Sequence, residues 1–389
     1  MQEDQQYLVP DYYPDFRCKQ GACRTACCEG WPISFSMQDY FRLLSIPCSQ
    51  ELRRKLDSAM HLCDHPLPDH YAQISPRYDG KCPLHLPDGR CQMHAELGES
   101  MLSAVCRLYP RGIRTGDDRE CSCANSCEAV LELFLEHPGP LTFMRIPMTS
   151  GLPDTPPRIH FFHTEGREQE IRLWLISHLQ DRTRSLPQRL LLMGEALHRL
   201  DDALTSRDAA RLDALLTGRE ALPAPPAINT ADDQLLGGLK IVERLLTIVD
   251  ERSRSIHDYG EAALAYLGVG EAACARCREG ASSFAGLMPD WETWFEHMLV
   301  NHMYFVQFPF QDRPVPLKDE YLALCAVYAL LRVLLIGCIS SRPTRETAVD
   351  VCAAAFRLID HTEFDRFAAP VLRKLGCDDL ASLCRLLCL

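Results

Sequence analysis

The chain lacks several features that common functional classes require. Its 389 residues carry a net charge of -12, whereas proteins that track nucleic-acid phosphates present a basic domain. No glycine-rich loop follows a strand-like run, so a dinucleotide-type cofactor fold is not expected. The first residues, Met1 to Tyr7, are acidic and amide-bearing instead of basic and then apolar. We therefore expect no export signal and a protein of the reducing cytoplasm.

Runs of alternating strand-like residues and repeats of fixed length are also missing, whereas helical periodicity fills the second half of the chain. The sequence predicts a mainly α fold without a Rossmann-type sheet. An irregular cysteine-rich metal-binding domain spans residues 1–137, a proline-rich linker follows over 138–157, and a multi-helix domain spans 158–389. The predicted helices of that domain are about 167–181, 187–204, 207–217, 231–253, 258–267, 289–306, 317–339, 344–361 and 363–388. A second, shorter linker is predicted at 221–227.

The cysteine-rich part has little predicted regular structure. Residues 36–62 are predicted as helix, with Ser36 as N-cap and a break at Pro47, and further short helices are predicted at about 94–108 and 125–137. Proline, glycine and histidine are frequent from 66 to 116. Irregular chain of this length is uncommon in a compact domain unless something other than secondary structure holds it, and a metal would do so.

One predicted helix is apolar enough for a membrane. Tyr321 to Ile339 is almost continuously apolar, but Arg332 lies at its centre and the flanking charges show no lysine or arginine bias. We therefore expect a buried core helix and no membrane span.

Cysteine is abundant and unevenly placed. Of the twenty cysteines, twelve fall at or before residue 127, and four lie between Cys18 and Cys28 on a segment punctuated by glycines. In the cytosol, clustered cysteines are more often metal ligands or catalytic thiols than disulfides. Six later cysteines lie on helical patterns and are expected in the core, namely Cys325, Cys338, Cys352, Cys377, Cys384 and Cys388. Cys274 and Cys277 have the spacing of a single zinc knuckle, which alone is weak evidence.

The spacing of the thiols favours an iron–sulfur cluster over zinc. Structural zinc sites usually show paired two-residue knuckles, whereas the gaps between the first four thiols here are four, three and zero residues. Zinc stays an alternative, with His85 and His94 as possible additional ligands. The C-x3-C-x2-C signature of radical S-adenosylmethionine enzymes is not present as such.

These motifs resemble a known family. The first part of the chain resembles a bacterial zinc- or iron-chelating cysteine-rich domain. The motifs that carry this resemblance are Phe16-Arg-Cys18, Cys23-x3-Cys27-Cys28-x-Gly30-Trp31, Cys82-Pro-Leu-x5-Gly89-x-Cys91 and Cys106-Arg-Leu-Tyr-Pro110. With Ser126-Cys127-Glu-Ala and the segment Asn301 to Phe310, the chain resembles the flagellin lysine N-methylases. The matching cysteines, which the resemblance implies as metal ligands, are Cys18, Cys23, Cys27, Cys28, Cys82, Cys91, Cys106 and Cys127. A four-iron cluster needs only four ligands. Cys121 and Cys123 fall outside this frame.

The resemblance implies methyl transfer from S-adenosylmethionine to lysine side chains of flagellin, in a cytoplasmic enzyme with a 4Fe-4S cluster. A lysine amine with a pKa near 10.4 must lose its proton before it attacks a methyl group. Polar candidates for this chemistry are Tyr109, Asp290, Glu296, His302 and Tyr304, and spacing selects none of them as catalytic or cofactor-binding. The alternatives are a non-catalytic metal-binding assembly protein and a redox protein with Cys27 and Cys28 as exchanging thiols.

Overall fold

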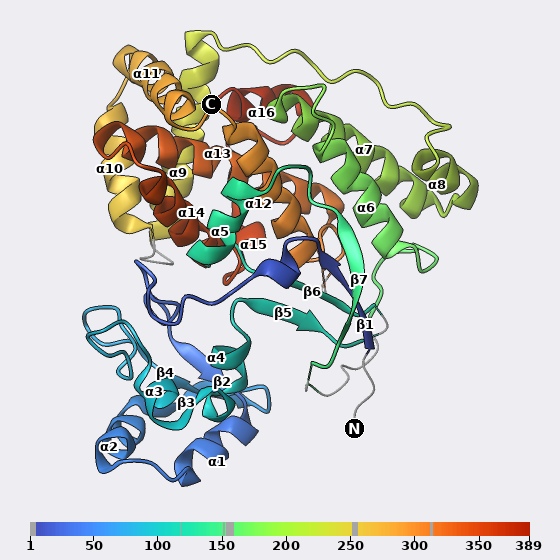
Figure 1. Ribbon diagram of the computed structural model, residues 1–389. Coiled ribbons are helices and arrows are strands. Elements are labelled where there is room, and N and C mark those ends of the chain that lie inside the picture. The colour runs from blue at the N-terminus through green and yellow to red at the C-terminus, as the bar shows by residue number, and fades with distance from the viewer. Residues whose placement is uncertain (1–4, 117, 151, 153–158, 251–255, 312–313) are drawn as a thin grey trace. The chain divides into compact units, whose positions relative to one another are not determined.

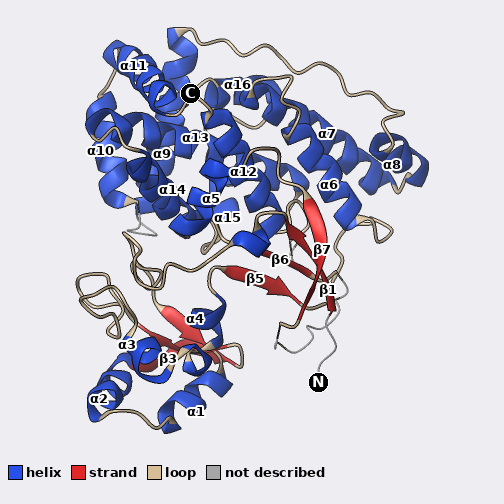
Figure 2. Ribbon diagram, viewed as in Figure 1, coloured by secondary structure: helices blue, strands red, loops and turns tan. Residues whose placement is uncertain are grey.

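The computed structural model describes residues 5–116, 118–150, 152, 159–250, 256–311 and 314–389. The chain forms two compact units. A small unit contains Asp15–Gly112 and Cys127–Ala129, and a large unit contains Met1–Pro14, Ile113–Ser126 and Val130–Leu389. Helices predominate among the described residues (Figure 2), which confirms the predicted mainly α fold. The domain boundaries expected at 137 and 157 stay a prediction. The two compact units describe how the chain packs, and they divide it at other points.

The small unit is built on a three-stranded antiparallel sheet with the order β2-β4-β3. Short helices pack on it because their apolar residues, such as Leu43 on α1 and Leu52 and Leu56 on α2, join Phe35 and Ile74 of the sheet in one core. Ser36 caps α1 as predicted, since its side chain accepts a hydrogen bond from the Asp39 N–H. The elements of this unit are β2 (Ile33–Phe35), α1 (Met37–Ser45), α2 (Gln50–Ala59), β3 (Met60–Leu67), β4 (His70–Ile74), α3 (Gln92–Leu97), η2 (Glu99–Met101) and α4 (Ala104–Leu108).

A second, four-stranded sheet has the order β5-β6-β1-β7. β1 (Gln5–Pro10) runs parallel to β6 (Glu120–Cys123) and antiparallel to β7 (Phe143–Met148), while β5 (Arg111–Arg114) forms the other edge. η1 (Tyr13–Asp15) follows β1. β7 lies inside the segment predicted as a linker, so that prediction was wrong for 143–148. Its Pro147 is compatible with a strand because β7 is an edge strand.

The helices of the large unit surround one central helix (Figure 1). α13 (Leu317–Ser341) packs against α7, α9, α10, α11, α12, α14, α15 and α16. All its residues from Tyr321 to Ile339 are buried, which confirms the predicted core helix, although its length and composition alone would also suit a membrane span. Arg332 is accommodated because its Nε donates to the Leu389 carbonyl at 3.1 Å and its guanidinium lies 4.1 Å from the Trp291 ring centroid.

The helices of the large unit have the following bounds: α5 (Glu128–Glu136), α6 (Glu168–Leu179), α7 (Leu186–Ser206), α8 (Ala209–Leu216), α9 (Asp232–Asp250), α10 (His257–Leu267), α11 (Glu271–Leu287), α12 (Trp291–Phe305), α14 (Arg345–Ile359), α15 (Phe364–Lys374) and α16 (Leu380–Leu387). Most match the predicted ranges closely. The first two residues of α5 belong to the small unit.

Two helix predictions were wrong, and one helix was not predicted. The range 94–108 forms α3, η2 and α4, because Gly98 follows α3 with a φ of +85°. The range 363–388 is interrupted because Gly376 ends α15 with a φ of +63° and Asp379 caps α16 by accepting from the Ser382 N–H at 2.9 Å. The helix that was not predicted is α11. Its buried residues Ala273, Cys277, Gly280 and Phe284 follow helical spacing, but small side chains give a weak apolar stripe. The predicted 221–227 linker is confirmed as irregular chain.

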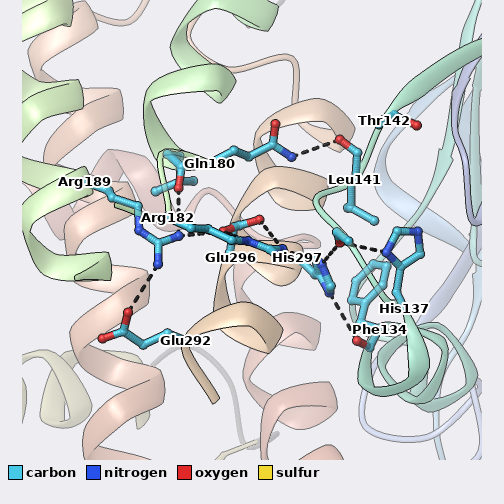
Figure 3. A network of polar contacts seen from close by, with 12 residues as sticks. Phe134, His137, Leu141, Thr142, Gln180, Arg182, Arg189, Glu292, Glu296 and His297 are labelled. Atoms are coloured by element: carbon cyan, nitrogen blue, oxygen red, sulfur yellow. Dashed lines mark hydrogen bonds and ion pairs between the residues drawn. The ribbon is translucent and has the colours of Figure 1, made fainter. Parts of the chain in front are cut away.

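Buried ion pairs hold α12 in place (Figure 3). The Glu296 carboxylate is fully buried and accepts two hydrogen bonds from Arg182, at 2.8 and 2.9 Å, and one from Arg189 at 2.6 Å. His297, the next residue, contacts the carbonyl oxygens of Phe134 and Gly139. Removing one partner of such a buried network usually costs about 3–5 kcal/mol, because the remaining charge has no counterpart. Glu296 therefore has a structural role.

Candidate functional site

All eight cysteines implied as ligands by the resemblance lie in the small unit. Cys127 is distant from the other seven in the sequence, yet it belongs to the same compact unit as residues 15–112. Cys28, Cys82, Cys91 and Cys106 also pack at the edge of that unit's hydrophobic core. All twenty cysteines of the chain are described, and each is a thiol rather than half of a disulfide.

The first cysteine segment is joined to the second by backbone contacts. The Cys82 N–H donates to the Cys28 carbonyl at 3.0 Å, and the Gly30 N–H donates to the Gly80 carbonyl at 2.8 Å. Further along, Gly21 and Gly89 touch so closely that a Cβ on Gly89 would lie 2.2 Å from the Gly21 oxygen. Both glycines have positive φ. These contacts explain why glycine punctuates both segments.

A buried carboxylate holds the loop between Cys23 and Cys27. Glu128, in the first turn of α5, accepts from the backbone N–H of Arg24 at 3.0 and 3.2 Å and from that of Thr25 at 3.4 Å. Lys19 Nζ adds an ion pair at 2.7 Å, and the Glu128 side chain is only 3% exposed. Glu128 therefore attaches Cys127 and its neighbours to the first cysteine segment. The sequence contains this signal in Ser126-Cys127-Glu128-Ala129, but a partner for the carboxylate is visible only in the structure.

Burial and neighbouring charges raise the pKa values of three of these thiols, Cys23, Cys28 and Cys106. Burial, followed by the charges of Glu128, Cys18 and Cys27, raises the pKa of Cys23 to about 11. A hydrogen bond with Cys27 lowers the pKa of Cys28, but a hydrogen bond with Cys82, burial and the charges of Cys82 and Cys91 together raise it to about 12. Burial is also the main cause that raises the pKa of Cys106 to about 12, with contributions from Cys27 and Cys91.

The thiols that influence one another's pKa values include seven of the eight cysteines. They are Cys18, Cys23, Cys27, Cys28, Cys82, Cys91 and Cys106. Within the described residues, no three histidine, cysteine, aspartate or glutamate side chains form a metal-ligand group. The chemistry of the donors, however, fits a thiolate-bound metal or cluster, because soft sulfur ligands are gathered at the edge of an apolar core. Which of the eight cysteines are ligands stays a prediction, as does the participation of His85 and His94.

The remaining cysteines lie away from this group. Cys121 and Cys123 are fully buried on β6 in the large unit. Cys274 and Cys277 lie on the buried face of α11, where Cys274 Sγ donates to the Asp232 carbonyl, so their spacing is that of a helix. The predicted core positions are confirmed for Cys325, Cys338, Cys352 and Cys384, which lie buried on later helices. Cys377 is also buried but lies between α15 and α16, and Cys388, directly after α16, is partly exposed.

The Asn301–Phe310 segment forms the end of α12 and the chain after it. Its side chains make several buried hydrogen bonds with other segments. Asn301 Nδ2 donates to the Cys123 carbonyl at 2.8 Å and to Asn125 Oδ1 at 2.7 Å, and Tyr12 donates to Asn301 Oδ1 at 2.6 Å. Gln307 donates to Glu120 at 3.2 Å. The side chains of Asn125 and Ser126, which precede α5, bind Asn301 and His361.

The five polar residues named as candidates from the sequence have different surroundings in the structure. Tyr304 donates to the Leu8 carbonyl at 2.9 Å, and burial raises its pKa well above the usual value. Glu296 lies in the ion-pair network of Figure 3, Asp290 directly precedes α12, and Tyr109 packs near Trp31 in the small unit. His302 alone among the five both lines a cavity and contacts a buried carboxylate.

Two cavities of the large unit have side chains suited to ligands. The larger, of 450 Å³, lies between the 160–166 segment and the junction of α7 with α8, and includes His160, Phe162, Glu165 and Arg207. The smaller, of 120 Å³, lies among α12, α13, α14 and α15 and includes His302 and Asp360. Phe162 of the larger cavity contacts Phe310, with 5.4 Å between the ring centroids.

Residues 172–386 match the sequence profile of the FliB lysine N-methylase C-terminal domain. The matched range covers more than half of the chain and includes both residues of the His302–Asp360 pair. The chain belongs to the FliB lysine N-methylase family. Two curated relatives are the proteins named Lysine-N-methylase from Salmonella choleraesuis strain SC-B67 and Salmonella typhimurium strain LT2. Each is 23% identical over 361 residues, with 86% of both chains covered. No solved structure matches the chain.

Membership in the FliB family confirms the family predicted from the cysteine and Asn301–Phe310 motifs. The profile match begins at residue 172, after all eight framed cysteines, so their ligand role rests on the resemblance and on their gathering in the small unit. Asp360 was missed by sequence reasoning. It carries no motif of its own, and the tertiary fold brings it 2.8 Å from His302, 58 residues earlier.

The contact between Gly21 and Gly89 yields a first prediction. Gly89→Ala introduces a methyl group into the Gly21 backbone and also places alanine at positive φ, which costs about 1–2 kcal/mol by itself. Limited trypsinolysis should then cleave at Arg24, Lys81 and Arg90 faster than in the wild type. Gly80→Ala is the matched control, because Gly80 also has positive φ but nothing lies within 4 Å of its Cβ position. Equal cleavage of the two variants would contradict the contact.

The Glu128 contacts yield a second prediction. Glu128→Gln removes the charge that accepts from Arg24, Thr25 and Lys19, and each hydrogen bond to a charged group contributes about 1.5–3 kcal/mol. Hydrogen exchange at the Arg24 and Thr25 amides should accelerate by at least about tenfold. Glu136→Gln, on the exposed side of the same helix, should leave these amides unchanged. Slow exchange retained in Glu128→Gln would show that the loop does not depend on this carboxylate.

Proposed function

We propose that this protein is a lysine methyltransferase that transfers methyl groups from S-adenosylmethionine to lysine side chains of flagellin in the cytoplasm. The observation that carries the proposal is the match of residues 172–386 to the FliB lysine N-methylase C-terminal domain. The two Salmonella relatives bear the name Lysine-N-methylase, and their alignments extend over 86% of each chain. The flagellin substrate rests on the family resemblance.

Charge and cavity size support the two substrates. The net charge of -12 attracts a protein that presents lysine side chains. The cavity of 450 Å³ falls in the range usual for small-molecule sites, about 300–1,000 Å³. It contains Arg207, which suits a carboxylate, and Phe162, which suits an aromatic base. These side chains have the chemistry to bind and orient an adenosyl amino acid.

We further propose that cysteines of the small unit hold an iron–sulfur cluster. The candidate ligands are the eight framed cysteines, of which Cys18, Cys23, Cys27, Cys28, Cys82, Cys91 and Cys106 influence one another's pKa values and Cys127 is the eighth. A cluster bound here would supply electron-transfer chemistry and would also cross-link residues far apart in the chain. The protein's own contribution is to hold the thiols together through Glu128 and the contact between Gly21 and Gly89.

The redox alternative has less support. Disulfide exchange needs an accessible thiolate, and reactive cysteines have lowered pKa values. The pKa of Cys28 is instead raised to about 12, so this thiol is poorly suited to exchange. The non-catalytic metal-binding alternative is decided by the methylation experiment.

The methyltransferase proposal predicts that flagellin incubated with the anaerobically purified protein and S-adenosylmethionine gains multiples of the methyl mass on surface lysines. Mass spectrometry of tryptic peptides measures the gain. Replacing Cys23 or Cys28 by Ser should abolish it, whereas Cys48→Ala, a thiol of the same unit outside the framed set, should not. Unmodified flagellin beside soluble, metal-loaded protein would favour the non-catalytic alternative.

The cluster proposal predicts that the anaerobically purified protein contains iron and acid-labile sulfide and absorbs visible light. Because metal-binding energy is also folding energy in such a unit, Cys82→Ser and Cys106→Ser should lose the metal together with the protease resistance of residues 15–112. Cys48→Ala should retain both. Zinc without sulfide would exclude the iron–sulfur cluster in favour of the zinc alternative.

A further inference from the structure

The volume of the smaller cavity in the large unit limits the size of the ligand that it can hold. Its volume is 120 Å³, and roughly 10–15 Å³ of such volume holds one water-sized group. The cavity therefore has room for the few heavy atoms of one amino-acid side chain, but not for a whole adenosyl cofactor. It lies among the end of α12, the first turns of α13, the end of α14 and the start of α15.

Seven of the thirteen residues that line this cavity are apolar, and the other six are polar or charged. Phe308, Leu324, Val327 and Phe364 line it and are each 2% exposed or less. These side chains suit the methylene groups of a flexible aliphatic chain, whose transfer out of water is favourable.

Acidic groups interrupt the apolar lining. Glu320 is 3% exposed, and its Oε2 accepts from Gln311 Nε2 at 2.6 Å. Asp360 also lines the cavity, and its side chain is fully buried. Asp365 is a third carboxylate in the lining. The negative charge of these groups, beside the apolar residues of the same cavity, favours a ligand that is aliphatic along its length and cationic at its end, as a lysine side chain is.

The third group in the cavity is a histidine whose orientation is set by Asp360. His302 Nδ1 donates to Asp360 Oδ1 at 2.8 Å, and Asp360 Oδ2 accepts from the Asn125 N–H at 3.1 Å. A carboxylate held from two sides fixes the proton of the imidazole on Nδ1. Nε2 then carries the lone pair, and it is the ring nitrogen available to a group in the cavity.

We propose that this cavity binds the side chain of the substrate lysine and that His302 accepts the proton of its ammonium group. This inference rests on the proposed lysine methylation. The four methylenes lie against the apolar walls, and the carboxylates of Glu320 and Asp360 attract the cationic end. The arrangement supplies what the reaction needs, since an amine with a pKa near 10.4 is almost entirely protonated at neutral pH.

One methyl transfer begins with the loss of a proton from the substrate lysine. The ammonium gives a proton to His302 Nε2, and the resulting imidazolium is stabilised by Asp360. The lone pair of the amine nitrogen forms a bond to the methyl carbon of the sulfonium donor as the carbon–sulfur bond breaks. The electron pair of that bond stays on sulfur, which leaves as a neutral thioether. The imidazolium later returns its proton to water, and the cycle repeats for further methyl groups.

Binding and catalysis can be measured separately. The binding probe is Nα-acetyl-L-lysine amide, compared with its norleucine counterpart, which lacks the amine, by isothermal titration or ligand-observed NMR. The full-length wild type should bind the lysine probe at least tenfold more tightly. Ala323→Leu adds three carbons to a residue that lines the cavity and should weaken binding at least tenfold. Glu320→Gln, which preserves size, should also weaken binding.

A separate variant tests whether His302 accepts the proton. His302→Asn keeps a donor for Asp360 but lacks Nε2, so it should bind the lysine probe within about threefold of wild type and lower the kcat for flagellin methylation by at least a hundredfold, in the range usual for a general base. Asp319→Asn is the matched control, because Asp319 precedes Glu320 on α13 but pairs with Arg373 outside the cavity. It should leave both measurements unchanged.

The outcomes distinguish this inference from the proposed function. If flagellin is methylated and both Ala323→Leu and Glu320→Gln bind and methylate like the wild type, the cavity is not the lysine site, although the enzyme is a methyltransferase. If the lysine probe binds and Ala323→Leu abolishes binding, but no methyl group is transferred, the cavity assignment stands and the proposed function fails. An unchanged kcat in His302→Asn would exclude His302 as the base.

Discussion

The hydrogen bonds of residues 123–129 are the constraint on which both candidate sites depend. The backbone N–H of Asn125 binds Asp360, which in turn orients His302, while the Asn125 side chain binds Asn301 and the Met298 carbonyl. Three residues later, Glu128 holds the loop that contains the first cysteines. One short segment thus provides a partner for the proposed base in the large unit and for the thiol loop in the small unit. Its polar groups are buried and paired, so each replacement would leave an unpaired group.

On α12, the side chains that make structural contacts and the side chain of the proposed base lie on different faces. His297, Asn301 and Tyr304 follow helical spacing and bind backbone groups of the α5 region, β6 and β1. His302 and Val306, four residues apart on another face, line the cavity. Because Glu296 and its two arginines fix the helix, His302 is placed on a rigid element rather than on a loop. Preorganisation of this kind is what positioning catalysis requires.

The small unit combines a modest hydrophobic core with a concentration of thiols. Its core consists of one short sheet and short helices, and the loops between them are held by glycine contacts and by Glu128. Gathered, partly buried thiols repel one another when ionised, and this effect contributes to the raised pKa values of Cys23, Cys28 and Cys106. A metal would replace those protons and convert repulsion into cross-links, so ligation and folding of the unit would be coupled.

The sequence by itself determined the mainly α class, the burial of Tyr321–Ile339, most helix bounds and the lysine N-methylase family, because helical periodicity and cysteine spacing are local signals. It did not determine the strands, since β1, β6 and β7 become a sheet only through partners more than a hundred residues away. Nor did it distinguish His302 from Tyr304 or Glu296, because each is a polar residue on the same helix. Only the tertiary structure placed Asp360 and a cavity beside His302, and it did so through contacts between helices distant in sequence.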